Sequence, residues 1–136
     1  MTKNRNDTNI KNKVKQALIS TVKVISQDFK KNIEIIDEKT TKKFDFIDLD
    51  NLVTKKDFLK ARATSDSIAL KRKFSNENIY KKNLPSNSSC KSLYSIAEKI
   101  RYECLGAKML KGIKKNLEDN YNQIISSKKI ERPKFK

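Results

Sequence analysis

The sequence predicts a mainly α-helical domain with a small β-hairpin after its first helix. Three observations predict this fold class. Apolar residues recur at intervals of three and four in several segments, which is the periodicity of a helix with one buried face. The 136 residues include 2 Gly and 2 Pro, too few for the many tight turns of an all-β fold. The length and a hydrophobic content of 36% suit one domain with a modest core.

The first helix is predicted from about Thr8 or Asn9, either of which can serve as its N-cap, to about Phe29. Its apolar face is a row of residues at spacings of 4, 4 and 3: Val14, Leu18, Val22 and Ile25. The preceding residues are polar and charged, so we expect residues 1–12 to form a flexible N-terminal segment.

Two short β-prone runs follow the first helix. Residues 33–36 read IEII and residues 44–47 read FDFI, and the polar residues 37–43 separate them. This arrangement predicts a small hairpin with a loose loop. A hairpin of this size needs a helix to cover it.

The second helix is predicted to start after Thr54 and to run to about Phe74. Thr54 and Asp57 have the spacing of a capping box, with Asp in place of the usual Glu. One stripe of this helix is expected to be formed by residues at helical spacing: Leu59, Ala63, Asp66, Leu70 and Phe74.

Three further helical segments are predicted. Residues 75–84 form a short helical turn that Pro85 ends, and the polar loop 86–89 can cap the next helix. That helix should end near Gly106, which we interpret as a C-cap glycine. Its expected inner face is Leu93, Ile96, Ala97, Ile100 and Cys104. The last helix is expected over residues 113–125, with an inner face of Ile113, Leu117, Tyr121 and Ile124.

These elements predict one helical domain over residues 13–125 and a linker-like tail over residues 126–136, which contains Pro133. The first residues do not form a secretory signal, and no apolar run is long enough to span a membrane. We therefore expect a soluble, cytoplasmic protein without a membrane partner.

The composition argues against catalytic, cofactor-binding or metal-binding residues in this chain. It contains no His, the usual ligand or base in zinc, haem and triad chemistry, and 2 Cys cannot form a four-thiolate metal site. Gly106 and Gly112 do not have the spacing of a phosphate-binding loop, and Ile113 stands where that loop needs Lys. We expect no catalytic site and no cofactor in the chain itself.

The positive charge leaves one alternative function open. Lys and Arg number 32 against 16 Asp and Glu, which gives +16, as in many nucleic-acid-binding proteins. However, 27 of these residues are Lys and 5 are Arg, although Arg is the better ligand for phosphates and base edges. With 13 Asn and 15 Ile beside them, this composition indicates AT-rich codon drift. A small basic nucleic-acid-binding protein is therefore the alternative interpretation, with nucleic acid not the expected partner.

A set of charged residues borders the apolar faces of two predicted helices. Asp66 lies within the stripe of the second helix, and Arg62 lies four residues earlier on the same side. Glu98, Arg101 and Glu103 border the apolar face of the later helix. Because a half-buried carboxylate requires a partner, we expect these five residues to form one polar network, which either pairs the two helices or docks a partner. An acid–base pair of carboxylates is disfavoured, because no nucleophile or metal accompanies it.

Three blocks of the sequence resemble one known family. Residues 62–70 read RATSDSIAL, residues 98–106 read EKIRYECLG, and residues 112–117 read GIKKNL. In this order and spacing they are similar to the patterns R-G-x-x-D-S-x-A-L, E-x-x-R-x-E-A-x-G and G-V-x-x-N-L. These patterns belong to the N-terminal region of CobT, a subunit of the aerobic ATP-dependent cobaltochelatase. Residues 14–18 and 33–35 resemble the family's first helix and following strand more weakly.

The chain departs from the family pattern in two ways. The family tends to carry His-Asp after its first block and a further His nearby, where this chain has Ser75-Asn76 and then Tyr80. The family also continues through an acidic linker into a von Willebrand A-like domain with a metal-ion motif. We therefore expect this chain to be a fragment or a split subunit.

The resemblance implies a non-catalytic assembly domain in cobalamin biosynthesis. CobT-type subunits assemble with an AAA+ ATPase subunit of the CobS type and a large CobN-type subunit. That complex uses ATP, magnesium and cobalt, and it inserts cobalt into hydrogenobyrinic acid a,c-diamide. Salt-sensitive binding to DNA or RNA would instead favour the nucleic-acid alternative.

Overall fold

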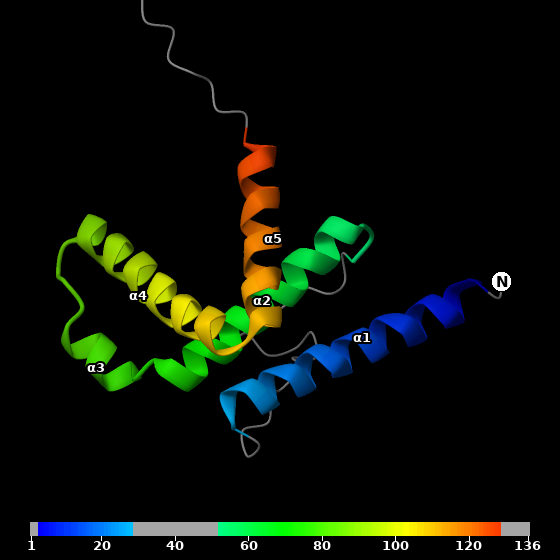
Figure 1. Cartoon of the computed structure of the whole chain (residues 1–136), viewed down its shortest axis with the longest axis horizontal. Helices are drawn as coiled ribbons and strands as arrows, with labels where there is room; N and C mark the ends of the chain where they lie inside the picture. The colour runs from blue at the N-terminus through cyan, green and yellow to red at the C-terminus, as the bar shows by residue number, and fades with distance from the viewer. Residues whose placement is uncertain (1–2, 29–51, 129–136) are drawn as a thin grey trace, which may run out of the picture.

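The computed structural model describes residues 3–28 and 52–128 of the chain, and these form five helices. Figure 1 shows them in chain order: α1 (Lys3–Ser26), α2 (Lys55–Phe74), α3 (Glu77–Lys82), α4 (Ser88–Met109) and α5 (Lys111–Ser127). The prediction of a mainly α-helical fold is confirmed. The expected hairpin, at residues 33–36 and 44–47, lies outside the described residues.

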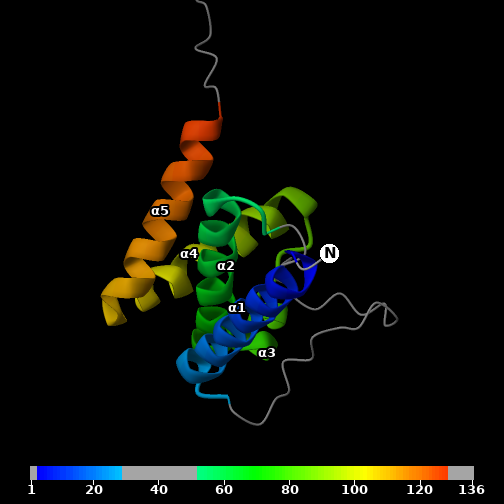
Figure 2. The ribbon, with the colours of Figure 1, turned by 90° about the vertical axis from the view of Figure 1, so that its right-hand side faces the viewer.

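Helix α2 is the central element of the described structure. It packs against α1, α4 and α5, and α4 also packs against α5. In Figure 2, α1 lies on one side of α2 and α5 on the other. The core between these helices consists of Val22, Ile25, Ala63, Ala69, Leu70, Tyr102, Ile113 and Leu117.

Small side chains allow three helices to approach α2 at once. Its buried residues include Ala61, Ala63, Ser65, Ser67 and Ala69, which lie on several faces of the helix. The Ser65 hydroxyl donates to the Ala61 carbonyl oxygen at 3.0 Å, so burial does not leave it unsatisfied. The predicted stripe is largely confirmed, because three of its members are buried (Ala63, Asp66 and Leu70) and Leu59 and Phe74 are partly buried.

Helices α2, α3 and α4 each start at a side-chain cap. The predicted capping box is present: Asp57 N donates to Thr54 Oγ1 at 3.2 Å, and Thr54 N donates to Asp57 Oδ2 at 2.8 Å. Asn76 caps α3, and Asn87, in the predicted capping loop, caps α4.

The ends of the first helix differ from the prediction. Helix α1 begins at Lys3, earlier than Thr8, and ends at Ser26, before Phe29. Gln27 follows with a φ of 58°, the left-handed conformation that commonly stops a helix. The wider division of the chain into residues 1–12, 13–125 and 126–136 stays a prediction.

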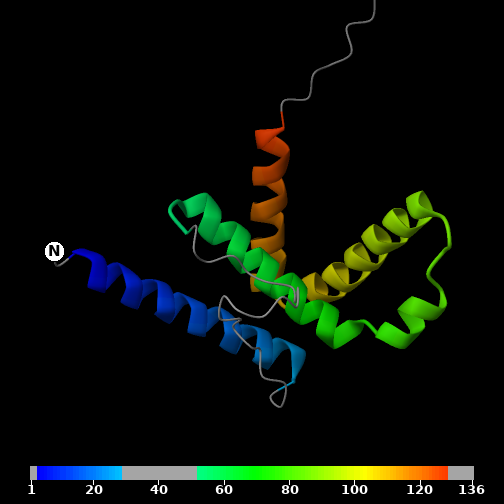
Figure 3. The ribbon, with the colours of Figure 1, turned by 180° about the vertical axis from the view of Figure 1, so that it is seen from behind.

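The predicted inner face of α4 is wrong. Leu93, Ile96 and Ile100 are 67%, 56% and 54% exposed, and Cys104 is also exposed. The buried residues of α4 are Tyr102, Glu103 and Gly106. The reason is that α4 packs through its C-terminal half, while its N-terminal half extends beyond α2 and α5 with α3 beside it (Figure 3). Apolar periodicity identified the helix but not the face that meets the core.

Gly106 is not the C-cap of α4, which continues to Met109. It lies at the contact with α2, where an added Cβ would be 2.3 Å from both δ carbons of Leu70. Leu70 is fully buried, so the absence of a side chain at Gly106 is what allows α2 and α4 to approach this closely. Leu110, in an extended conformation, separates α4 from α5.

The last helix is confirmed with slightly wider bounds than predicted. Its predicted face is buried at Ile113 and Leu117, which are 4% and 6% exposed. The face becomes partly exposed further along, where Tyr121 and Ile124 are each 38% exposed. Gly112 belongs to the first turn of α5, and an added Cβ there would meet nothing within 4 Å.

The two glycines give a matched test of this packing. Gly106→Ala should lower the free energy of unfolding by about 1–3 kcal/mol, because the new methyl group overpacks the contact with Leu70. Gly112→Ala should raise it by about 0.5 kcal/mol, because alanine restricts the unfolded chain and fits the helix without a clash. Urea denaturation of both variants measures the difference. Equal stability of the two would show that α2 and α4 are not in tight contact.

Candidate functional site

The five residues of the expected network lie in three separate clusters. Arg62 and Asp66 lie on the part of α2 that faces the start of α5, and Glu103 lies where α2, α4 and α5 meet. Glu98 and Arg101 lie where α4 passes the end of α2. Within residues 3–28 and 52–128, the three clusters share no hydrogen-bonding partner. The structure therefore brings together Glu98 with Arg101 and Arg62 with Asp66, but not the two pairs.

The Asp66 residue is 3% exposed and is hydrogen-bonded to α5. Its Oδ2 accepts a hydrogen bond of 2.7 Å from Asn116 Nδ2 on α5. Burial raises the pKa of Asp66, although the Asn116 hydrogen bond and the charge of Arg62 act in the opposite direction. Ionised Asp66 is therefore less stable in the folded protein than in water.

The Glu103 carboxylate is 6% exposed and joins three helices. Its Oε1 accepts a hydrogen bond of 2.5 Å from the Ser67 hydroxyl on α2, and its Oε2 accepts one of 2.6 Å from the Tyr121 hydroxyl on α5. Lys99 Nζ lies 3.9 Å from Oε1. Hydrogen bonds from hydroxyls to a carboxylate are short and strong, so both oxygens are satisfied. Burial and the bond to Glu103 raise the pKa of Tyr121, which keeps it a donor.

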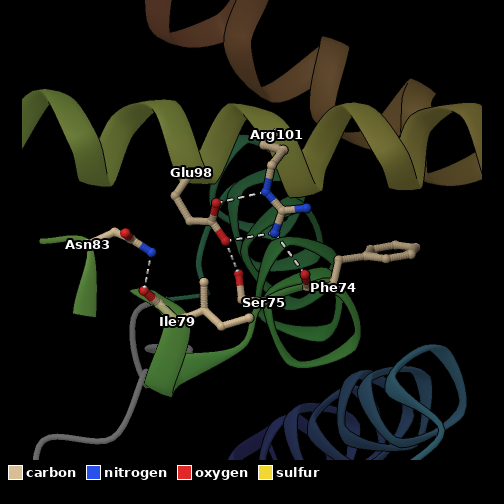
Figure 4. A network of polar contacts seen from close by, with 6 residues as sticks. All are labelled: Phe74, Ser75, Ile79, Asn83, Glu98 and Arg101. Carbon is tan, nitrogen blue, oxygen red and sulfur yellow. Dashed lines mark hydrogen bonds and ion pairs between the residues drawn. The ribbon is translucent and has the colours of Figure 1, made fainter. Parts of the chain in front are cut away.

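The Glu98–Arg101 pair connects α4 to the C-terminal end of α2 (Figure 4). Arg101 binds Glu98 through two hydrogen bonds of 2.7 Å, from Nε to Oε2 and from Nη2 to Oε1. Arg101 Nη2 also donates to the Phe74 carbonyl oxygen at 2.7 Å, and the Ser75 hydroxyl donates to Glu98 Oε1 at 2.5 Å. The guanidinium thus satisfies a carbonyl that the end of α2 leaves unpaired, and it complements the helix dipole. These contacts lower the pKa of Glu98 to about 2, chiefly through Arg101.

Ser75 and Tyr80, which stand where the family tends to carry His, have local structural roles here. Ser75 donates to Glu98, as described above. The Tyr80 hydroxyl is hydrogen-bonded to Ser95 Oγ at 2.6 Å, and its ring lies against Tyr94 with centroids 5.1 Å apart. Tyr80 and Ser75 therefore hold α3 and the end of α2 against α4.

Sequence reasoning missed the hydroxyl and amide groups that satisfy the buried carboxylates. The partners it did not identify are Ser67, Ser75, Asn116 and Tyr121. Ser67 and Asn116 stand inside the sequence blocks that carry the family resemblance, which is a signal that could have marked them. The prediction considered charged partners and overlooked neutral ones.

One face of α4 stays exposed although its residues are apolar. We call residues 76–100, which include α3 and the N-terminal half of α4, the arm; it extends away from α1 and α5 (Figure 1). Leu93, Ile96 and Ile100 form an exposed apolar row along it, at spacings of 3 and 4. Ile79, on α3, is 60% exposed.

Within the part of the chain that the structure describes, no group of three or more His, Cys, Asp or Glu side chains could hold a metal ion. Cys90 and Cys104 are both exposed and are not joined in a disulfide. Among the described helices, none has the length and apolar content needed to cross a membrane.

Comparison with known proteins gave one family. The family model described as Cobalamin biosynthesis protein CobT matches residues 9–134. No curated protein and no solved structure matches the chain.

Asp66 should reduce stability at neutral pH. A carboxyl whose pKa is raised by folding lowers the free energy of unfolding when it is ionised. This loss disappears as the pH falls through the pKa of the folded state and the group becomes protonated. We expect Asp66→Asn, which keeps an oxygen for Asn116, to raise the free energy of unfolding by about 1 kcal/mol at pH 7. The gain should shrink as the pH is lowered toward 4. Urea denaturation between pH 7 and pH 4 measures the difference in stability between the variant and the wild type. A variant that is less stable at pH 7 would show that the favourable contacts of ionised Asp66 with Arg62 and Asn116 outweigh the cost of its burial.

Glu98 should have the opposite pH dependence. Its pKa falls from an ordinary 4.5 to about 2 on folding, so its contribution is present above pH 5 and is lost as the pH falls toward 2. Because Arg101 is about half exposed, we expect Glu98→Gln to lower the free energy of unfolding by about 1–2 kcal/mol at pH 6. The difference from wild type should shrink between pH 5 and pH 2.

The matched control is Glu118→Gln, because Glu118 makes an exposed ion pair of 3.8 Å with Lys114 on α5. That variant should change the free energy of unfolding by less than about 0.5 kcal/mol throughout the same pH range. A loss for Glu98→Gln that stays constant across the pH range would show that packing, and not charge, was removed.

Proposed function

This chain belongs to the CobT family of cobalamin biosynthesis proteins, and from that membership we propose that it is a non-catalytic assembly domain of a cobaltochelatase. Membership gives it a role in cobalamin biosynthesis associated with the cobaltochelatase. In the proposal, the domain supports ATP-driven insertion of cobalt into hydrogenobyrinic acid a,c-diamide. A CobS-type AAA+ subunit hydrolyses ATP with magnesium, a large CobN-type subunit inserts the metal, and all three work in the cytoplasm.

The observation that carries the assembly role is the exposed apolar row on the arm. Leu93, Ile96 and Ile100 are each more than half exposed, although they lie on one helix at the spacing of a buried face. A helix that presents its apolar side to water is a typical docking element for a groove on a partner protein. The core contacts the C-terminal half of α4, so the fold does not require the row to be buried.

The charge of the arm indicates the chemistry of the partner surface. The arm carries four lysines and two glutamates, a net charge of +2, and the whole chain carries +16. Such a helix is best complemented by an apolar groove with an acidic rim, since complementary charge at the rim speeds association and selects the partner. We propose that the CobS-type ATPase subunit carries this groove, because the resemblance implies that CobT-type subunits assemble with it.

Two substitutions in the row test the docking role. Ile96→Glu and Ile100→Glu should each weaken binding to the ATPase subunit at least tenfold, because a charge would be placed in an apolar contact. Both positions are exposed, so the melting temperature should not fall. Calorimetric titration of the purified ATPase subunit with the full chain measures the affinity.

Val24→Glu is the matched control, because Val24 is 62% exposed but lies on α1. It should bind the ATPase subunit like wild type. Equal loss for all three variants, or no loss for either isoleucine variant, would contradict the arm as the docking element. A gel-shift assay of the full chain with DNA and RNA tests the alternative function, because salt-sensitive binding would favour a nucleic-acid-binding protein.

A further inference from the structure

A pocket of about 380 Å³ opens where α2, α4 and α5 meet. Its apolar walls come from all three helices and include Ile68, Tyr102 and Leu117. Glu103 also lines it, but both oxygens of this carboxylate already accept hydrogen bonds from hydroxyl groups. The apolar row on the arm does not line the pocket, so the proposed docking role does not account for it.

Asn120 on α5 lines the pocket and contains an unpaired buried atom. Within residues 3–28 and 52–128, its Oδ1 is the one buried side-chain nitrogen or oxygen without a hydrogen-bond partner. Buried polar groups in proteins are almost always paired with protein atoms or ordered water, so this atom requires an explanation. The last torsion of an Asn side chain is broad, so a modest rotation of the amide turns Oδ1 toward a ligand in the pocket. Asn120 can therefore accept a hydrogen bond from one N–H or O–H group.

Two lysines line the same pocket, Lys71 from α2 and Lys99 from α4. The Lys99 side chain is half exposed, and its Nζ lies 3.9 Å from Glu103 Oε1, beyond hydrogen-bond distance. Because the Glu103 oxygens hold hydroxyl donors, the Lys99 ammonium keeps N–H groups available for another acceptor. Hydrogen bonds between an ammonium group and a carboxylate are stronger than those between neutral groups. The pocket thus offers a cationic donor from α4 and a neutral acceptor from α5.

We propose that this pocket binds a small carboxylate with an apolar body and one N–H or O–H group. The N–H or O–H group donates to Asn120 Oδ1, the body lies against the apolar walls, and the carboxylate accepts from the Lys99 ammonium. The volume of the pocket falls in the range of ordinary small-molecule sites. This inference goes beyond the assembly role and does not depend on it.

Indole-3-propionate and 1-methylindole-3-propionate form a matched pair of probes. Both have the carboxylate and the same ring system, but the second has no N–H donor and carries an extra methyl group. Without a hydrogen bond from the ring, the methylated probe should bind at least as tightly, because the methyl group adds apolar surface. With the hydrogen bond to Asn120, indole-3-propionate should bind roughly fivefold more tightly. Titrations of the ¹⁵N-labelled full chain at pH 7 and low salt, followed by amide NMR shifts, give both dissociation constants.

Two variants locate the acceptor and the pocket. Asn120→Leu replaces the amide by an apolar side chain of similar size, so the preference for indole-3-propionate should disappear. The melting temperature should not fall, because this variant removes an unpaired buried acceptor. Thr64→Phe, at a partly buried position of α2 that lines the pocket, fills the space and should weaken both probes at least tenfold.

A third variant tests the carboxylate contact. Lys99→Gln should weaken both probes roughly threefold, which is the effect expected of a partly exposed ion pair. Lys108→Gln is the matched control, because it removes the same charge from an exposed residue of α4 that does not line the pocket. It should leave both dissociation constants unchanged.

Each other outcome overturns part or all of the proposal. Equal or tighter binding of the methylated probe to the wild type would remove the Asn120 contact, as would a preference for indole-3-propionate that survives Asn120→Leu. A loss for Lys99→Gln no larger than that for Lys108→Gln would remove the carboxylate contact. Unchanged binding to Thr64→Phe would place the site elsewhere. No shift with either probe up to its solubility limit would overturn the pocket as a binding site.

Discussion

The close approach of α4 to α2 at Gly106 and Leu70 is the constraint on which the rest of the described structure depends. A side chain at Gly106 would overlap Leu70, which is fully buried, so this contact fixes how near the two helix axes come. The same closeness requires small residues along α2, and alanine and serine supply them. Other helices therefore cover several faces of α2. Polar groups on those faces are removed from water, so they need hydrogen-bond partners on the neighbouring helices.

The three polar clusters show different solutions to that requirement. Glu103 receives two hydroxyl donors, one from each neighbouring helix, so its burial also sets the register of α2, α4 and α5. Glu98 is paired with Arg101, which in turn satisfies the end of α2. Asp66 accepts a hydrogen bond from the Asn116 amide on α5, so this carboxylate connects α2 to α5.

The sequence predicted those features that local chemistry determines. The capping box at Thr54, the cap in the loop before α4 and the helical periodicity of α2 and α5 all depend on residues close in the chain, and all are present. The inner face of α4 and the role of Gly106 could not be predicted in the same way. A row such as Leu93, Ile96 and Ile100 has the same spacing whether it meets a core or a partner, and a glycine in a helix does not reveal which helix approaches it. The distribution of charged residues among three clusters likewise depends on tertiary contacts.

The exposed row of α4 follows from the same constraint. Because α4 is fixed to α2 through its C-terminal half, its N-terminal half is held beyond the core at a set angle, with the Glu98–Arg101 pair near the point where it leaves α2. The apolar row is then presented on a helix whose position is already determined before any partner arrives. Binding through such an element requires little ordering of the chain, and preorganised surfaces lose less free energy on association. In the proposed assembly role, the row would act through its fixed position on α4.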